Sequence, residues 1–180
     1  LLTEEDTEMN NAHVLARWER SLDATSDFSL QLYYDRSERL DSTAEVVTDA
    51  FDIDFQHRRA LGLRHELAWG AGYRLDRDEL ISSLKLGFVP EERTTHLFSA
   101  FVHDELALIR DHLRWSLGAK VEHNGYTGFE YQPSTRLLWI PAPRHALWIA
   151  ATRAVRTPSR TDSDVRLAFR VFPSQPLSPD

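Results

Sequence analysis

The sequence predicts an all-β fold: an antiparallel up-and-down meander of about eight or nine strands that forms part of a transmembrane β-barrel. Apolar and polar residues alternate in segments of about 10 to 12 residues, the length that a tilted strand needs to cross a bilayer. Short and long connections alternate along the chain, which is typical of outer-membrane barrels. Charged residues share one parity with glycine and serine. Together these patterns favour strands with one apolar and one polar face.

The alternation is clearest in residues 63–74, where Leu67, Trp69 and Tyr73 share one parity and Glu66 and Arg74 the other. Successive side chains of a strand point to opposite faces, so one face of this strand is apolar. Segments 95–105 and 147–156 carry apolar residues on both parities, and their faces stay unassigned. Further strands are predicted at residues 12–20, 27–35, 47–57, 95–105, 112–124, 129–140, 147–156 and 165–172.

The connections predict which edge of the sheet carries the loops. Residues 21–26, 58–62, 106–111 and 141–145 form short turns, whereas residues 36–46 and 75–94 are long and are expected to be extracellular loops. Residues 125–128 are short where a long loop is expected.

Composition narrows the class of protein. The net charge of -7 argues against a nucleic-acid partner, which would require a basic surface. Cysteine is absent, so disulfides and thiolate metal sites are excluded. The longest uncharged stretch, residues 94–103, is far shorter than the ~18 apolar residues that a membrane-spanning helix requires. Only a barrel could take this chain across a bilayer.

A soluble β-sandwich or a small-barrel ligand-binding module would show a similar alternation and stands as the alternative. Two features favour the membrane barrel. Charges interleave with glycine and serine, as in a charged lumen. Aromatic residues flank the short turns, with Trp18 and Phe28 at one turn and Trp139 and Trp148 at another, which resembles an aromatic girdle.

The candidate ligand-binding or lumen-lining residues are the charged members of the polar parity, and we expect them to act electrostatically. No G-x-S-x-G elbow, P-loop or H-E-x-x-H motif is present, so an enzyme is not expected. No cofactor and no metal site is predicted either, because Asp49 lies on the opposite parity to Asp52 and Asp54. The candidates are Asp35, Arg64, Glu66, Arg74, Lys120 and Glu122.

Four segments carry a family resemblance: FVHDE at 101–105, LGAKVEHN at 117–124, GFEYQPSTRLLW at 128–139 and RAVRTPS at 153–159. In this order and spacing they resemble the barrel domain of TonB-dependent outer-membrane receptors. Each segment alone is modestly specific, but four in order form a strong signal.

The resemblance implies an outer-membrane transport receptor for a scarce ligand such as a ferric siderophore or cobalamin. It implies a bacterial outer-membrane location, contact with outer-membrane lipid, and energy from the TonB protein acting through a plug domain. Under this interpretation residues 1–180 are a partial β-barrel domain of a larger receptor, and the plug domain and the remaining strands lie outside the sequence.

Overall fold

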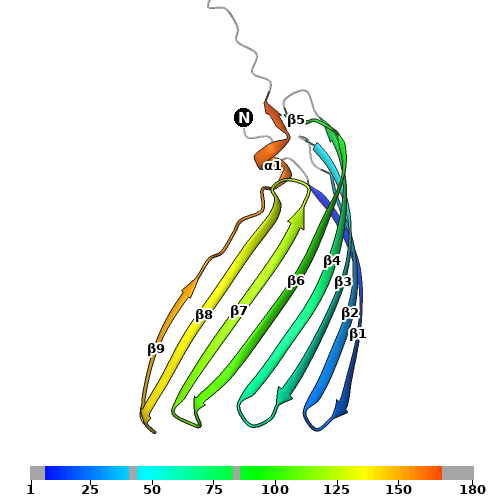
Figure 1. Ribbon diagram of the computed structural model, residues 1–180. Coiled ribbons are helices and arrows are strands. Elements are labelled where there is room, and N and C mark those ends of the chain that lie inside the picture. The colour runs from blue at the N-terminus through cyan, green and yellow to red at the C-terminus, as the bar shows by residue number, and fades with distance from the viewer. Residues whose placement is uncertain (1–6, 41–43, 83–85, 168–180) are drawn as a thin grey trace, which may run out of the picture.

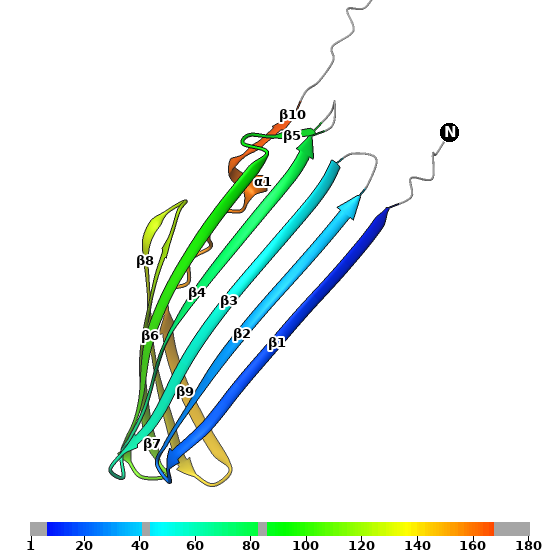
Figure 2. The same cartoon turned by 90° about the vertical axis from the view of Figure 1, so that its right-hand side faces the viewer.

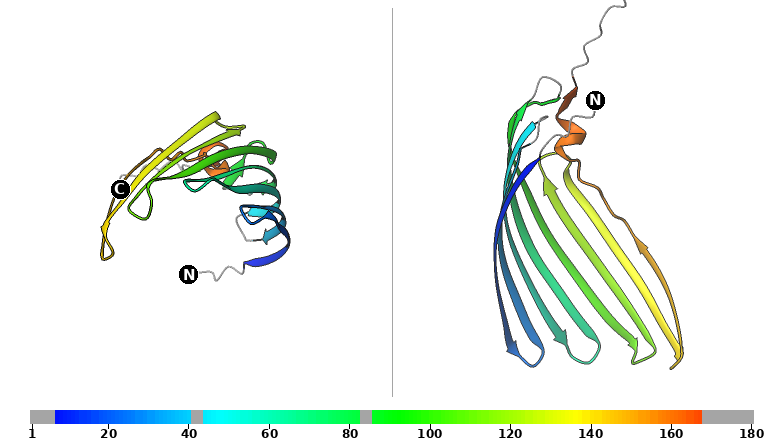
Figure 3. Two further views of the ribbon diagram at one scale, coloured as in Figure 1. Left: turned by 60° about the horizontal axis from the view of Figure 1, so that its bottom comes forward. Right: turned by 180° about the vertical axis from the view of Figure 1, so that it is seen from behind.

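The computed structural model describes residues 7–40, 44–82 and 86–167. They form one eight-stranded antiparallel sheet in the order β1-β2-β3-β4-β6-β7-β8-β9, with each strand beside the next (Figure 1). The sheet bends into an open arch (Figure 3). The predicted up-and-down meander is confirmed. Its strands are β1 Glu8–Asp23, β2 Ser26–Leu40, β3 Ala44–Leu61, β4 His65–Ser82, β6 Glu92–Ile109, β7 Leu113–Asn124, β8 Gly128–Ala142 and β9 His145–Thr152.

The prediction that residues 165–172 add a strand to the barrel sheet is wrong for residues 165–167, the part that the structure describes. β10 (Val165–Leu167) pairs instead with β5 (Leu86–Phe88) in a separate two-stranded sheet, and residues 168–172 lie outside the described residues. The chain leaves the large sheet after β9, which ends at Thr152. Ser159 then caps the short helix α1 (Arg160–Ser163). Within the described residues, no helix is long and apolar enough to cross a membrane.

Most of each predicted long loop is strand. β2 continues to Leu40 and β3 begins at Ala44, while β4 continues to Ser82 and β6 begins at Glu92. The sequence pattern hid these extensions because charged residues occupy both parities there, so the alternation fades while the backbone ladder continues. Exposed ion pairs join neighbouring strands, with Arg36 Nη1 3.3 Å from Asp49 Oδ2 and Arg77 Nη2 3.5 Å from Glu92 Oε2. These strands, of 15 to 18 residues, are longer than the 9–11 residues that a strand needs to span a bilayer.

The strand register assigns a face to every strand, because residues directly opposite each other share a face. The row Ile53, Tyr73, Phe98 and His123 continues the apolar face across four strands. Helix α1 lies on the concave side of the arch (Figure 3), where Asp164 pairs with Arg93 of the polar parity. The polar face is therefore concave and the apolar face convex.

The two strands left unassigned by the sequence now have faces. In β6 the convex side carries Phe98, Ala100 and Val102, and the concave side carries Phe101. In β9 Leu147 and Ile149 are convex, opposite Trp139 and Leu137, whereas Trp148 lies opposite Leu138 on the concave side. Apolar residues on the concave face had masked the alternation.

Large apolar side chains of the convex face are open to the surroundings. Trp69 is 43% exposed, Trp115 38% and Leu117 41%. Across the described residues no second sheet covers this face, as Figure 2 shows. A soluble β-sandwich would bury these side chains between two sheets, so that alternative is wrong.

Candidate transmembrane wall and lumen

Aromatic rings on the convex face form a band near the hairpin turns, here called the turn-side band. Its ring centroids follow one another across the first strands: Trp18 to Phe28 at 5.1 Å, Phe28 to Phe55 at 6.1 Å and Phe55 to Trp69 at 5.4 Å. Edge-to-face and tilted contacts at such distances are favourable aromatic geometries. Trp115 and Trp139 of β7 and β8 extend the band.

A second band lies farther along the strands, toward the strand ends opposite the hairpin turns, and is here called the loop-side band. Helix α1 lies near those strand ends (Figure 1). Tyr73 and Phe98 have centroids 4.7 Å apart, and His123 and Phe129 4.5 Å. From Phe129 to Trp139 a strand rises about 33 Å at about 3.3 Å per residue. At the usual tilt of about 40° this spans about 25 Å, the height of the apolar band of an outer-membrane barrel.

The predicted pairing of Trp139 and Trp148 in one girdle is wrong. Trp139 lies on the convex face, but Trp148 faces the concave side, with the Arg136 guanidinium 5.5 Å from its ring centroid. Trp148 directly follows Leu147, which lies opposite Trp139. Direct neighbours in a strand point to opposite faces, so Trp148 cannot share the face of Trp139.

On the concave face, the first charged group surrounds Arg74. Its Nε donates to Asp76 Oδ1 at 3.1 Å, and Asp52 lies directly opposite Arg74 on the neighbouring strand. The Tyr33 hydroxyl donates to Asp35 Oδ1 at 3.1 Å. Two of the predicted site residues, Asp35 and Arg74, thus belong to one acidic patch of the concave wall.

The second charged group surrounds Glu122, which is only 9% exposed. Lys120 Nζ lies 2.7 Å from Glu122 Oε1, and Gln132 Nε2 donates to Glu122 Oε2 at 2.9 Å. Glu130 is directly opposite Glu122 and lies 3.7 Å from Arg153 Nη2. The structure therefore brings together the predicted pair Lys120 and Glu122.

Glu66 lies in a third group near the turns. Arg58 Nη1 is 3.6 Å from Glu66 Oε1, and Arg58 Nη2 is 2.9 Å from Asp27 Oδ2. Glu105 lies opposite Glu66 and is neutralised by Arg114 at 3.1 Å. This group is a local ion-pair network, separated along the wall from the two groups above.

Arg64 was predicted to line the lumen, but the structure places it in the turn between β3 and β4. β4 begins only at His65, because Gly62 adopts a left-handed conformation with φ 66° and turns the chain. The Arg64 carbonyl accepts a hydrogen bond from the Ala107 amide at 2.8 Å. This residue belongs to the turn, where it lines a pocket together with Glu66 and Glu105.

The sequence interpretation missed a segment that folds over the concave face, residues 153–164, here called the strap. Arg93 Nη1 donates to both Asp164 oxygens, at 2.7 and 2.8 Å. Arg160 donates to Asp164 at 3.1 Å and to the carbonyls of Glu91 and Pro90. The one available signal was the capping box, in which Ser159 and Asp162 bond each other's backbone N–H groups.

A cavity of about 260 Å³ lies between the strap and the wall, with Asp76, Asp78, Tyr126 and Arg160 among its lining residues. Burial raises the pKa of Asp78, a shift opposed by a hydrogen bond from Thr48. Burial also acts to raise the pKa of Asp164, but the hydrogen bonds from Arg93 and Arg160 outweigh it and lower that pKa. The strap is thus held by an ionised carboxylate. The described residues contain no group of three or more His, Asp or Glu side chains that could hold a metal ion.

An antiparallel sheet with an uncovered apolar convex face, aromatic bands and a charged concave face defines a wall of a membrane β-barrel. A sequence profile of the family "TonB dependent receptor-like, beta-barrel" matches residues 4–176, and the chain belongs to this family. Its members are receptors and not enzymes. Among curated proteins, none matches the chain.

The fold is similar to that of the siderophore receptor PirA from Pseudomonas aeruginosa, with a TM-score of 0.72 and 12% sequence identity. The similarity covers 86% of this chain and 28% of PirA, so the chain spans little more than a quarter of that receptor's length. At this identity the likeness establishes the fold alone.

Proposed function

We propose that the chain forms part of the barrel wall of a bacterial outer-membrane transport receptor for a scarce ligand such as a ferric siderophore or cobalamin. The observation that carries this proposal is the opposition of the two faces: apolar side chains between two aromatic bands on the convex side, and charge networks on the concave side. A membrane barrel requires this arrangement, with lipid outside and a polar lumen inside.

The lumen role falls to five of the predicted residues: Asp35, Glu66, Arg74, Lys120 and Glu122. They bind and steer by charge, and no bond chemistry is assigned to them. The patch around Arg74 lies nearest the strap cavity and holds more carboxylates than guanidinium groups. Such a patch favours ligand groups that donate hydrogen bonds or carry positive charge.

Further strands are part of the proposal. β1 and β9 each pair on one side only among the described strands, and unpaired edges in a membrane are costly. A barrel closed by strands from the rest of the receptor satisfies both edges. A plug domain inside that barrel would carry the energy coupling to TonB.

The test uses the full-length receptor encoded by the complete reading frame. We expect it in the outer-membrane fraction, and we expect a deletion strain to lose uptake of one ligand from a panel of ⁵⁵Fe-loaded siderophores and ⁵⁷Co-cobalamin. Complementation with the wild-type gene restores that uptake. Recovery of the folded protein from the soluble fraction without detergent would overturn the proposal.

A further inference from the structure

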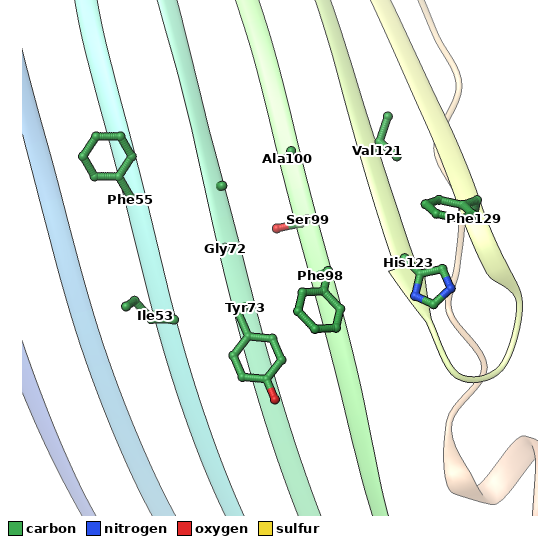
Figure 4. Close-up of a pocket in the computed structure, with 11 residues that line it drawn as sticks. Ile53, Phe55, Gly72, Tyr73, Phe98, Ser99, Ala100, Val121, His123 and Phe129 are labelled. Carbon is green, nitrogen blue, oxygen red and sulfur yellow. The ribbon is translucent and has the colours of Figure 1, made fainter.

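A shallow groove of about 450 Å³ crosses the convex face (Figure 4). It is bounded by rings of both aromatic bands and has an almost entirely apolar lining. It extends from β3 to β8, on the side that faces away from α1. Its lining residues are Ile53, Phe55, Ala71, Gly72, Tyr73, Phe98, Ser99, Ala100, Val121, His123 and Phe129.

The groove exists because two alanines lie side by side among larger residues. Ala71 of β4 is directly opposite Ala100 of β6, and the same row continues to Phe55 on one side and Val121 on the other. Both alanine side chains are exposed. A void beside apolar groups forfeits their dispersion contacts, so an apolar chain that fills it is stabilised.

A pair of hydrogen-bonding groups lies at the end of the groove nearest the strap. The Tyr73 hydroxyl lies 2.9 Å from His96 Nδ1. His96 is two residues before Phe98 on β6 and therefore lies closer to the strap than the Tyr73 and Phe98 pair does. Beyond them, Arg77 lies opposite Thr94 on the same face. The groove therefore offers an apolar floor at bilayer depth and hydrogen-bonding groups toward the surface, which matches an amphiphile with one polar end.

We propose that this groove binds one acyl chain of an outer-leaflet membrane lipid, with the lipid head group beside Tyr73 and His96. The inference rests on the proposed membrane location. The groove is continuous with the lipid-facing surface between the two bands, so lipid reaches it without displacing protein. The groove volume equals that of roughly 15 water-sized groups at about 30 Å³ each. This volume suits one acyl chain and is too small for a folded protein partner.

The test fills the groove in the purified full-length receptor. Native mass spectrometry in detergent measures retained lipid after addition of dipalmitoyl phosphatidylethanolamine or, in a second arm, lipid A. The double variant Ala71→Leu/Ala100→Leu should bind the added lipid about tenfold more weakly than wild type does. At a lipid concentration that saturates wild type, its spectrum should therefore show one retained lipid fewer. Retention of lipid A supports the proposal, whereas retention of the phospholipid alone overturns it, because lipid A is the lipid of the outer leaflet.

Ala119→Leu is the matched control, because Ala119 is also exposed on the convex face but lies outside the groove. It should retain lipid as wild type does. Equal retention by the double variant and wild type, or equal loss in the control, overturns the proposal. Ala100→Val adds only two methyl groups and should give partial loss, so it serves if the double variant does not fold.

The lipid-binding proposal and the transport proposal can be rejected independently. Heat-modifiable migration on gels reports that each variant is a folded barrel, and outer-membrane fractionation with ligand uptake reports the function. Wild-type uptake together with unchanged lipid retention in the double variant rejects the groove alone. A receptor that is absent from the outer membrane rejects both.

Discussion

Arg93 Nη1 lies within 2.8 Å of both carboxylate oxygens of Asp164, although 71 residues separate the two in the chain. The Arg93 guanidinium also lies 4.2 Å from the centre of the Tyr126 ring. This contact ties the strap to the concave wall near the ends of β4 and β6. Its strength decides whether the strap stays in place.

Arg93→Ala should loosen the strap without unfolding the sheet. The Asp164 side chain is 7% exposed and that of Arg93 26%, so the pair is well shielded from water. Its loss should cost about 2 kcal/mol locally, or roughly 30-fold faster amide exchange in residues 157–164. Hydrogen exchange of the full receptor measures this. Arg77→Ala breaks an exposed pair and should change exchange little; equal effects would contradict the assignment.

Acid should release the strap through Asp164. Its folded-state pKa is lowered, since the hydrogen bonds from Arg93 and Arg160 outweigh burial. A carboxyl with a lowered folded pKa stabilises the fold above its unfolded pKa of about 3.9, and this stabilisation is lost as pH falls through the folded value. The protection factors of residues 157–164, which are exchange rates corrected for the intrinsic pH dependence of amide exchange, should therefore be constant from pH 7 to about pH 4 and fall below that.

Asp164→Asn provides the control for this pH dependence. Asparagine keeps the size of the side chain but does not ionise, so strap exchange should be faster throughout and the step below about pH 4 should diminish. A step of unchanged size would assign the titration to another carboxyl. The pKa of Asp162 is also lowered, by hydrogen bonds from the Ser159 backbone and side chain, so it is the first alternative to examine.

Gly70→Ala should destabilise the barrel wall by at least about 2 kcal/mol. An added Cβ would meet the Phe55 carbonyl and would lie 2.6 Å from Phe101 Cε1. The carbonyl belongs to a paired strand and cannot move aside cheaply. Gly125→Ala is the matched control, because nothing lies within 4 Å of its added Cβ. Refolding yield into detergent measures both; equal yields would refute the close approach.

An arginine should be tolerated on one face of β2 and not on the other. Leu32 lies on the convex face, 38% exposed, and Leu32→Arg should cost about 2–4 kcal/mol in a bilayer. Gln31→Arg, one residue earlier, places the same charge on the concave face opposite Asp54 and should cost little. Folding into lipid vesicles compares the two. Similar folding efficiencies would contradict the face assignment.

Local pattern was sufficient where one parity is uniformly apolar. Leu67 and Trp69 alternate with Glu66 and Ala68, and this alternation alone predicts both the strand and its apolar side. The meander and the shared face of Lys120 and Glu122 were predictable for the same reason. Side chains two residues apart in a strand always share a face.

The sequence determined the antiparallel sheet, its two chemically distinct faces and the polar parity of five proposed wall residues. Tertiary structure alone decided the rest. Trp148 and Phe101 face inward because the register of neighbouring strands fixes their direction, and strand ends such as Leu40 depend on partners in the ladder. The strap depends on Arg93 and Asp164 meeting across the sheet. Contacts between residues distant in the chain leave no periodic trace, so only the folded wall reveals them.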